Sequence, residues 1–273
     1  MTKCTEIERS LIKKFRKSIW NRFIEAVQTY DLISEGDKIA VCISGGKDSF
    51  VLAKLMQELK RHGHTEFDLE FICMDPGYTP ANRKKIEQNC AIMEIPVNIF
   101  ESNIFSAVEN IEQSPCYLCA RMRRGCLYSK AQSLGCNKIA LGHHFNDVIE
   151  TVLMSMMYSS EIKTMLPKLH STNFPGMQLI RPLYKVKEND IISWANYNRL
   201  KFLQCACKFT EQSNEREDLS KRKETKALIE YIKTFNPNAD DNIFRSLHNV
   251  NLATLPAFRD SDSGEVHSFL EKF

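Results

Sequence analysis

Long apolar runs, a secretory signal and a strong net charge are all missing from this 273-residue sequence. No segment approaches the roughly 20 consecutive apolar residues that a membrane-spanning helix needs. Residues 1–14 contain charges where a secretory signal would be apolar. We therefore expect a cytoplasmic protein that does not contact a membrane. The formal net charge is only +3, and 43% hydrophobic with 26% charged residues is ordinary for a globular protein.

Ten cysteines are present, but disulfide bonds are not expected because the cytosol keeps thiols reduced. Cys4 lies in a polar segment and has no evident partner. Four others lie in apolar or strand-like surroundings and are most simply small core residues: Cys42, Cys73, Cys90 and Cys136.

Two close pairs of cysteines need a separate explanation: Cys116 with Cys119, and Cys205 with Cys207. Thiolates at Cys-x-x-Cys spacing can reach one metal centre, although this motif alone also fits a redox dithiol. The redox alternative is weakened because the motif is absent from the first strand–helix junction, where a thioredoxin-like pair lies. Four thiolates suit a tetrahedral zinc, whereas three suit a 4Fe-4S cluster with one iron open to an outside ligand.

The most informative segment lies between an apolar stretch and a helical pattern, and reads Ser44, Gly45, Gly46, Lys47, Asp48, Ser49. Its glycines allow a tight turn and the close approach of a ligand. The amides and the macrodipole of a helix start favour an anion, and Lys47 adds a positive charge. The spacing is not that of a Walker motif, and a plain glycine turn is the alternative. We predict a phosphate-binding loop.

Apolar stretches alternate with helical patterns over the first half of the chain, which predicts a parallel, doubly wound α/β sheet. The expected strands are residues 38–44, 68–75, 96–100 and 137–143. The expected helices are residues 49–61, 81–93, 121–133 and 147–157. Ligands of such sheets bind beyond the carboxyl ends of the strands.

The flanking regions have simpler patterns. An amphipathic helix is expected from residue 7 to near residue 36, a short hairpin within 158–182, and helices at 188–196, 215–234 and 238–249. We expect four parts: an N-terminal helix in 1–36, a nucleotide-binding core in 37–160, a C-terminal part in 161–258, and a loose polar tail in 259–273.

Positive charge is concentrated in two places. Residues 3–22 contain seven basic side chains against two acidic ones, including Lys13, Lys14 and Lys17. Residues 116–130 contain four basic side chains and no acidic one. Three of the four are Arg121, Arg123 and Arg124. Such patches are typical of nucleic-acid binding, although a solvated helix face is an equal alternative for either one alone.

Several polar residues follow the expected strands. His143, His144 and Asp147 could bind a metal or be structural, and Asp147 could simply cap a helix. At the carboxyl edge of the predicted sheet, the carboxylate of Asp147 could hold Mg²⁺ against phosphates. Asp48 is a second candidate for that ion. Asp75 ends the second strand and could approach a nucleoside. Arg181 could contact phosphate or RNA, or be an ordinary surface arginine.

The loop at 44–49 resembles the pyrophosphate loop of the PP-loop ATPases, which split ATP between its α and β phosphates to adenylate a carbonyl oxygen. Nearly the whole chain resembles the tRNA 2-thiocytidine synthetase branch of that family. The matching residues are the loop, Cys116–Cys119 with 121–125, Ala-Leu-Gly-His-His at 140–144, Ile-Arg-Pro-Leu at 180–183, and Cys205.

This resemblance implies a PP-loop (adenine nucleotide α-hydrolase-like) fold that binds ATP, Mg²⁺ and a 4Fe-4S cluster. Cys116, Cys119 and Cys205 would be the cluster ligands, with Cys207 as an alternative third ligand because it departs from the family pattern. Gly142 and His143 would lie beside the nucleotide, and Asp147 would bind Mg²⁺. A zinc site that uses all four cysteines stays open.

The implied reaction is the ATP-dependent thiolation of an anticodon-loop cytidine in tRNA. The C2 oxygen of the base attacks the α phosphate, and sulfur then displaces AMP. Lys47 and the loop amides would stabilise the departing pyrophosphate. The sulfur donor would be a persulfide-carrying protein or sulfide, and the N-terminal helix could pair two copies. The alternatives are a ligase of the lysidine-synthetase type, a zinc-stabilised RNA-binding protein without turnover, and thiolation or desulfurisation of another base.

Overall fold

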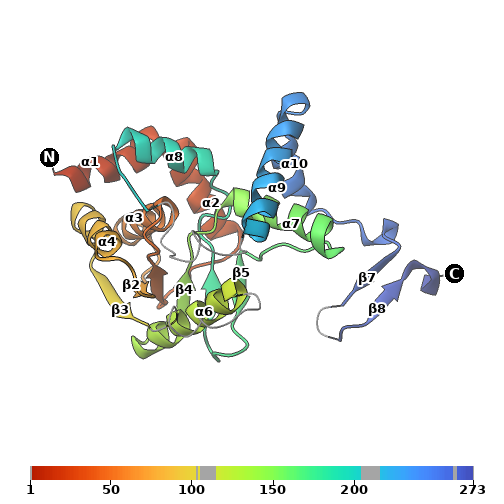
Figure 1. The fold of residues 1–273 in the computed structure, drawn as a ribbon, viewed down its shortest axis with the longest axis horizontal. Helices are drawn as coiled ribbons and strands as arrows, with labels where there is room; N and C mark the ends of the chain where they lie inside the picture. The colour runs from red at the N-terminus through yellow and green to blue at the C-terminus, as the bar shows by residue number, and fades with distance from the viewer. Residues whose placement is uncertain (1, 103, 105–114, 204–215, 261–262, 273) are drawn as a thin grey trace. The chain divides into compact units, whose positions relative to one another are not determined.

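The computed structural model describes residues 2–102, 104, 115–203, 216–260 and 263–272 (Figure 1). The chain divides into two compact units, Met1–Lys223 and Glu224–Phe273. The first contains a six-stranded sheet with the order β3-β2-β1-β4-β6-β5. Its strands are β1 Lys38–Cys42, β2 Asp68–Asp75, β3 Val97–Glu101, β4 Lys138–Ala140, β5 Lys168–His170 and β6 Gln178–Ile180.

The predicted fold class is confirmed, because five of these strands are parallel. All four predicted strands are present, and the predicted hairpin is β5 and β6. The hairpin extends the sheet beyond the expected four strands, since β6 pairs in parallel with β4. The strand order reverses at β1, which has β2 on one side and β4 on the other. A ligand site is expected where two such strands diverge.

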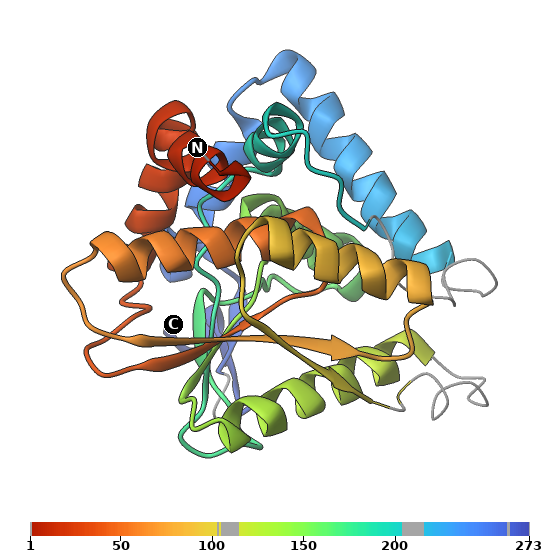
Figure 2. The same ribbon diagram turned by 90° about the vertical axis from the view of Figure 1, so that its left-hand side faces the viewer.

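Helices cover both faces of this sheet. The side chains of the central strand β1 alternate between the two faces and pack into two separate cores. Ile39 and Val41 belong to the core that also contains the buried side chains of α3 (Lys47–His62) and α8 (Glu188–Tyr197). Ala40 and Cys42 face Tyr128 of α6 (Pro115–Ser133). Figure 2 shows α6 in yellow-green beneath the sheet, with α3 in orange and α4 (Pro80–Ile92) in gold side by side above it.

Helix α6 begins six residues earlier than predicted, so Cys116 and Cys119 lie within the helix and not before it. Pro115 suits the first helical position, where its missing N–H leaves no hydrogen bond unmade. Farther along this helix, Met122 packs near Met74 at the carboxyl end of β2. The start of α6 therefore lies at the carboxyl edge of the sheet.

The N-terminal helix differs from the regular helix to residue 36 that was predicted. It consists of α1 (Lys3–Arg9), two π-helical segments η1 (Ser10–Lys14) and η2 (Arg16–Trp20), and α2 (Asn21–Thr29). Its buried residues recur every four positions: Ile7, Leu11, Phe15, Ile19 and Phe23. In a regular α-helix, each step of four residues would turn this stripe by about 40°. The wider π turns keep all five side chains on the core.

Two further helices follow in the first unit and at its boundary: α7 (Phe145–Ser159), close to its predicted bounds, and α9 (Arg216–Phe235). The second unit also contains α10 (Ala239–Ser246) and the strand pair β7 (Ala257–Arg259) and β8 (Val266–Ser268). The polar tail that was expected to be loose contains β8. The carboxylate of Asp260 accepts from the backbone N–H of Ser263, and Gly264 has a φ of 74°. None of the described helices is long and apolar enough to span a membrane.

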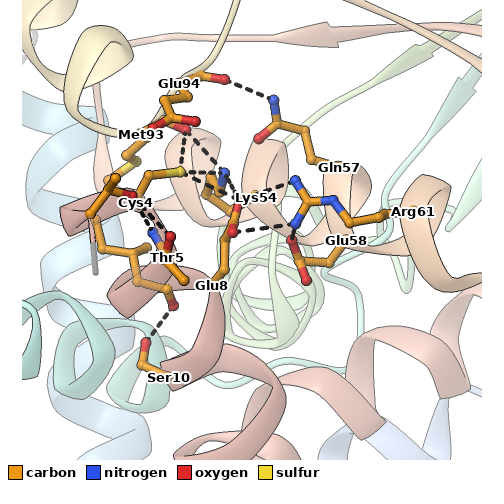
Figure 3. Close-up of polar contacts among 12 residues, drawn as sticks. Cys4, Thr5, Glu8, Ser10, Lys54, Gln57, Glu58, Arg61, Met93 and Glu94 are labelled. Carbon is orange, nitrogen blue, oxygen red and sulfur yellow. Dashed lines mark hydrogen bonds and ion pairs between the residues drawn. The ribbon is translucent and has the colours of Figure 1, made fainter.

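A buried ionic network attaches the N-terminal helix to α3 (Figure 3). Lys54 is only 1% exposed, and its ammonium donates to the carboxylate of Glu8 at 2.7 Å and to the carbonyl of Met93 at 3.0 Å. Cys4, whose role the sequence did not indicate, lies 3.3 Å from the same ammonium. Arg61 also pairs with Glu8. A buried lysine is tolerated only when it is paired in this way.

Lys54→Met should lower the free energy of unfolding by about 3 kcal/mol, because Glu8 would lose its buried partner. Lys60→Met is the matched control on the same helix, since Lys60 pairs with Asp68 in solvent and such pairs contribute little. Urea unfolding of both variants measures the difference. Equal stability of the two variants would contradict the structural role of this network.

Candidate functional site

The predicted phosphate loop connects β1 to α3, and its polar groups fix its shape. Gly46 is the N-cap residue of α3. The hydroxyl of Ser49 donates to the carbonyl of Gly46 at 2.9 Å and accepts from the backbone N–H of Ser44 at 3.2 Å. The loop is thereby closed on itself at the start of a 16-residue helix. The first backbone N–H groups of such a helix are available to an anion.

Gly45 is required at its position for two reasons. Its φ is 90°, which L side chains rarely adopt. A Cβ there would lie 2.8 Å from the Cδ1 of Leu203. The backbone N–H of Leu203 donates to the carbonyl of Gly45 at 3.1 Å. The loop is therefore held by a segment more than 150 residues away in sequence.

Gly142 follows β4 and lies directly against the start of α3. A Cβ on Gly142 would be 3.1 Å from the backbone carbon of Asp48 and 3.1 Å from the backbone nitrogen of Ser49. These neighbours are backbone atoms that cannot move aside easily. The structure thus brings Gly142 and the phosphate loop together, at the point where the strand order reverses.

Lys47 is held by two carboxylates. Its ammonium donates to Glu188 at 2.8 Å and to Asp48 at 3.2 Å. Burial acts to lower the pKa of Lys47, but the charges of Asp48 and Glu188 outweigh it, so the pKa is raised above its usual value. Lys47 therefore stays protonated. The other carboxylate oxygen of Asp48 is buried and has no hydrogen-bond partner among the described residues.

His144 and Asp147 form the N-terminal cap of α7. The carboxylate of Asp147 accepts from the backbone N–H of His144 at 2.9 Å, and the ring of His144 accepts from Asp147 in return. The Nε2 of His144 lies 3.8 Å from Asp48 and 3.9 Å from Glu188. The second oxygen of Asp147 lies 3.4 Å from Arg222. Capping therefore accounts for one oxygen of Asp147, and the other faces a cation.

His143 and Arg181 are both largely buried. Burial, followed by the charge of Arg181, lowers the pKa of His143 to about 4, so its ring is neutral at pH 7. The Nδ1 atom of His143 has no hydrogen-bond partner within the described part of the chain. Arg181 is 8% exposed and donates to the carbonyl of Leu166, which excludes the alternative of an ordinary surface arginine. Burial also lowers the pKa of Arg181 to about 10.

Asp75 ends β2 at the same edge, but its carboxylate is engaged locally. One oxygen accepts from the backbone N–H groups of Gly77 and Tyr78, and the other accepts from Arg83. Asp75 is 5% exposed. In this arrangement the carboxylate shapes the loop after β2.

The predicted cluster ligands are only partly described. Cys116 and Cys119 are one helical turn apart at the start of α6, whereas Cys205 and Cys207 lie outside the described residues. The chain that leads to Cys205 is well fixed: Asn89 donates to the carbonyl of Lys201, and Phe202 stacks on Phe50 at 5.3 Å. Among the described residues, no group of three or more His, Cys, Asp or Glu side chains is close enough to hold a metal.

The two basic patches lie on opposite faces of the sheet. Arg121, Arg123 and Arg124 belong to α6. Lys13, Lys14 and Lys17 are exposed on the N-terminal helix, whose buried side packs into the core of the other face. A single flat RNA surface that contacts both patches is therefore not available.

The contacts of Glu188 and Arg222 in this site were not predicted from the sequence. Glu188 was expected only as the first residue of a helix, and it contacts Lys47 across 141 positions. No local sequence pattern predicts a contact between residues so far apart in the chain. Of the two adjacent histidines, His144 lies beside Asp48, with its Nε2 atom 3.8 Å from that carboxylate.

Comparison with known proteins agrees with this geometry. The PP-loop domain family matches residues 12–223. The tRNA-cytidine(32) 2-sulfurtransferase of Citrifermentans bemidjiense is 36% identical over 236 residues, which cover 85% of this chain and 90% of that protein. The protein of the same name from Anaeromyxobacter dehalogenans strain 2CP-C is 33% identical over 243 residues, covering 88% and 81%.

A solved structure shows the same fold. It is the U34-tRNA thiolase NcsA from Methanococcus maripaludis with its 4Fe-4S cluster, with a TM-score of 0.67. The match covers 84% of this chain and 77% of that chain at 23% identity. The resemblances inferred from the sequence are thus confirmed for the family and the fold.

Gly45→Ala should weaken the binding of an adenine nucleotide by about tenfold, which corresponds to about 1.4 kcal/mol, because Leu203 would be displaced beside the loop. Gly36→Ala is the matched control: its φ of 78° imposes similar strain, but no atom lies within 4 Å of its Cβ position. Calorimetric titration with nucleotide compares the two. Similar affinities in both variants would show that close packing at Gly45 is irrelevant to binding.

Proposed function

This chain belongs to the PP-loop family, in the branch of the tRNA-cytidine(32) 2-sulfurtransferases, and from this premise we propose that it thiolates tRNA. It is an ATP-dependent enzyme that replaces the C2 oxygen of an anticodon-loop cytidine by sulfur. The observation that carries the proposal is the hydrogen bond from Leu203 to Gly45. It joins the phosphate loop to the segment that ends two residues before Cys205.

ATP binds with its phosphates at the start of α3. The backbone N–H groups of this helix and the ammonium of Lys47 stabilise the charge that develops on departing pyrophosphate. Mg²⁺ would be held by carboxylates at this edge, Asp147 and Asp48, because this ion takes one or two carboxylates together with phosphate oxygens. The buried oxygen of Asp48 that lacks a partner within the described residues fits such an ion.

Gly142 and His143 line the nucleotide side of the site. Gly142 has no side chain, so β4 and the phosphate loop can meet closely. The Nδ1 atom of the neutral His143 ring has no hydrogen-bond partner among the described residues and would be available to a polar group of the nucleotide. Asp75 acts indirectly, since its carboxylate holds the loop after β2.

Cys116, Cys119 and Cys205 would hold a 4Fe-4S cluster, with Cys207 as the alternative third ligand. The donor set fits, because three thiolates leave one iron open, and a spacing of three residues places Cys116 and Cys119 on one face of α6. The cluster would supply sulfur from a persulfide-carrying protein or from sulfide. The start of α6 and the segment before Cys205 both lie at the edge that holds the phosphate loop.

The substrate tRNA would bind over α6. Arg121 and Arg124 are exposed and can contact phosphates, with Arg123 beside them. Arg181 is buried, so it would stabilise the protein beneath this surface instead of contacting the tRNA directly. The lysines of the N-terminal helix lie on the other face of the sheet and would need a separate part of the tRNA, or serve a second copy of the chain. The target base must leave the loop stack to reach the site.

Cys116→Ala should abolish both the cluster absorbance of anaerobically purified protein and the formation of 2-thiocytidine in tRNA, because one of three thiolate ligands is lost. Cys126→Ala, in the same helix, should retain both. Iron and sulfide analysis with mass spectrometry of digested tRNA provides the measurement. A colourless zinc-containing wild-type protein that releases no AMP would instead support an RNA-binding protein without turnover.

Lys47→Met should lower the rate of ATP cleavage by at least about a hundredfold, because stabilisation of the departing pyrophosphate is lost. The cluster absorbance should not change, since Lys47 is no cluster ligand. Release of AMP in the presence of tRNA measures the rate, and Lys60→Met, on the same helix, is the control. Unchanged turnover in Lys47→Met would remove this lysine from the mechanism.

A further inference from the structure

We propose that Arg181 binds the α phosphate of the nucleotide, which stays on the target base when pyrophosphate leaves and later departs as AMP. This inference deepens the proposed function and rests on its ATP-binding part. It divides the site into two anion subsites. The phosphate loop takes the departing pyrophosphate, and the end of β6 takes the phosphate that remains.

Arg181 is a buried cation whose hydrogen-bonding capacity is only partly used. It is 8% exposed. Its Nη1 atom donates to the carbonyl of Leu166, whereas its Nε atom is buried and has no hydrogen-bond partner within the described part of the chain. Burial lowers the pKa of Arg181, and the favourable charge of Asp147 has a smaller effect on it than the unfavourable charge of Arg124. A buried donor without an acceptor is costly, so a ligand that supplies the acceptor is expected here.

Two neighbouring strands bring Arg181 to the nucleotide side of the sheet. β4 and β6 are parallel, and the backbone N–H of Leu141 donates to the carbonyl of Ile180 at 3.0 Å just beyond their last paired residues. Arg181 and Gly142 follow directly, so both lie at the carboxyl edge, where ligands of such sheets bind. Gly142 in turn packs against the backbone at the start of α3. The end of β6 is therefore joined through β4 to the phosphate loop.

His143 supplies a second polar group without a partner beside Arg181. Its Nδ1 atom is buried and makes no hydrogen bond to any described residue. Burial and then the charge of Arg181 lower the pKa of His143 to about 4, so its neutral ring adds no positive charge to the subsite at pH 7. A phosphate group has several acceptor oxygens. It can accept from the Nε of Arg181 and still leave an oxygen for a donor on the imidazole.

The α phosphate fits this position better than a phosphate of the RNA backbone. Arg121 and Arg124 are exposed on α6 and can reach an RNA backbone from the surface, whereas Arg181 is covered. A covered cation suits a phosphate that lies inside the site. When sulfur displaces AMP, the C2–S bond forms, and the electron pair of the C2–O bond goes to the phosphate oxygen. Arg181 would stabilise the negative charge that appears there.

The test is calorimetric titration of the cluster-loaded, full-length protein with AMP and, separately, with inorganic pyrophosphate, in one buffer that contains Mg²⁺. Arg181→Met should weaken AMP binding by at least about tenfold, as expected for the loss of one charge-assisted hydrogen bond. Pyrophosphate binding should not change. Arg181→Lys keeps the charge, so it should lose less affinity for AMP than Arg181→Met and should also bind pyrophosphate normally.

Lys138→Met is the matched control. Lys138 is also a buried cation beside β6, but it lies at the opposite end of β4 and pairs with Asp37 at 2.5 Å. This variant should leave the ratio of the AMP and pyrophosphate affinities unchanged. Unchanged AMP affinity in both Arg181 variants, or equal losses for AMP and pyrophosphate, would overturn the inference.

A third titrant, a single-stranded RNA oligonucleotide, distinguishes the two sources of phosphate. Weaker RNA binding with unchanged AMP binding in Arg181→Met would overturn the inference in favour of an RNA contact. Failure of the proposed function gives a different result. A wild-type protein that binds AMP through Arg181 but forms no 2-thiocytidine would refute tRNA thiolation alone. Normal thiolation with unchanged AMP affinity in the Arg181 variants would refute only this inference.

Discussion

The hydrogen bond between the backbone N–H of Leu203 and the carbonyl of Gly45 connects the two halves of this site. At this position Gly45 has a φ of 90°, which L side chains rarely adopt. The phosphate loop is thereby fixed from one side by the chain that leads to Cys205, and from the other by Gly142. The phosphate loop and the segment that precedes Cys205 thus lie at one edge of one sheet.

Electrostatic balance explains why the same edge can hold several charged groups. Lys47 is shared by Asp48 and Glu188, and Asp147 is shared by its own helix cap and Arg222. These pairs are partly buried, so each carboxylate needs its partner in the nucleotide-free state. The ionic network around Lys54 holds α3 against the N-terminal helix.

Local features could be predicted from the sequence, and features that depend on distant contacts could not. The strands and most helices of the core follow from apolar periodicity, and the loop at 44–49 follows from its glycines and lysine. The π turns of the N-terminal helix were not predicted. The sequence does contain a signal for them, because apolar residues recur there every four positions. The strand β8 in the polar tail was not predicted, because three residues are too few to show an alternating pattern. The contact between Lys47 and Glu188 could not be foreseen, since it depends on how α8 returns to the loop.

The central claim is that the base oxygen itself is activated by ATP at this edge, before sulfur replaces it. It is tested most directly with a tRNA whose target cytidine carries oxygen-18 at C2, incubated with the cluster-loaded protein, ATP and a sulfide source. The account predicts that the heavy oxygen appears in the phosphate of AMP, with one AMP for each 2-thiocytidine formed. Heavy oxygen released into water or into pyrophosphate would contradict adenylation of the base.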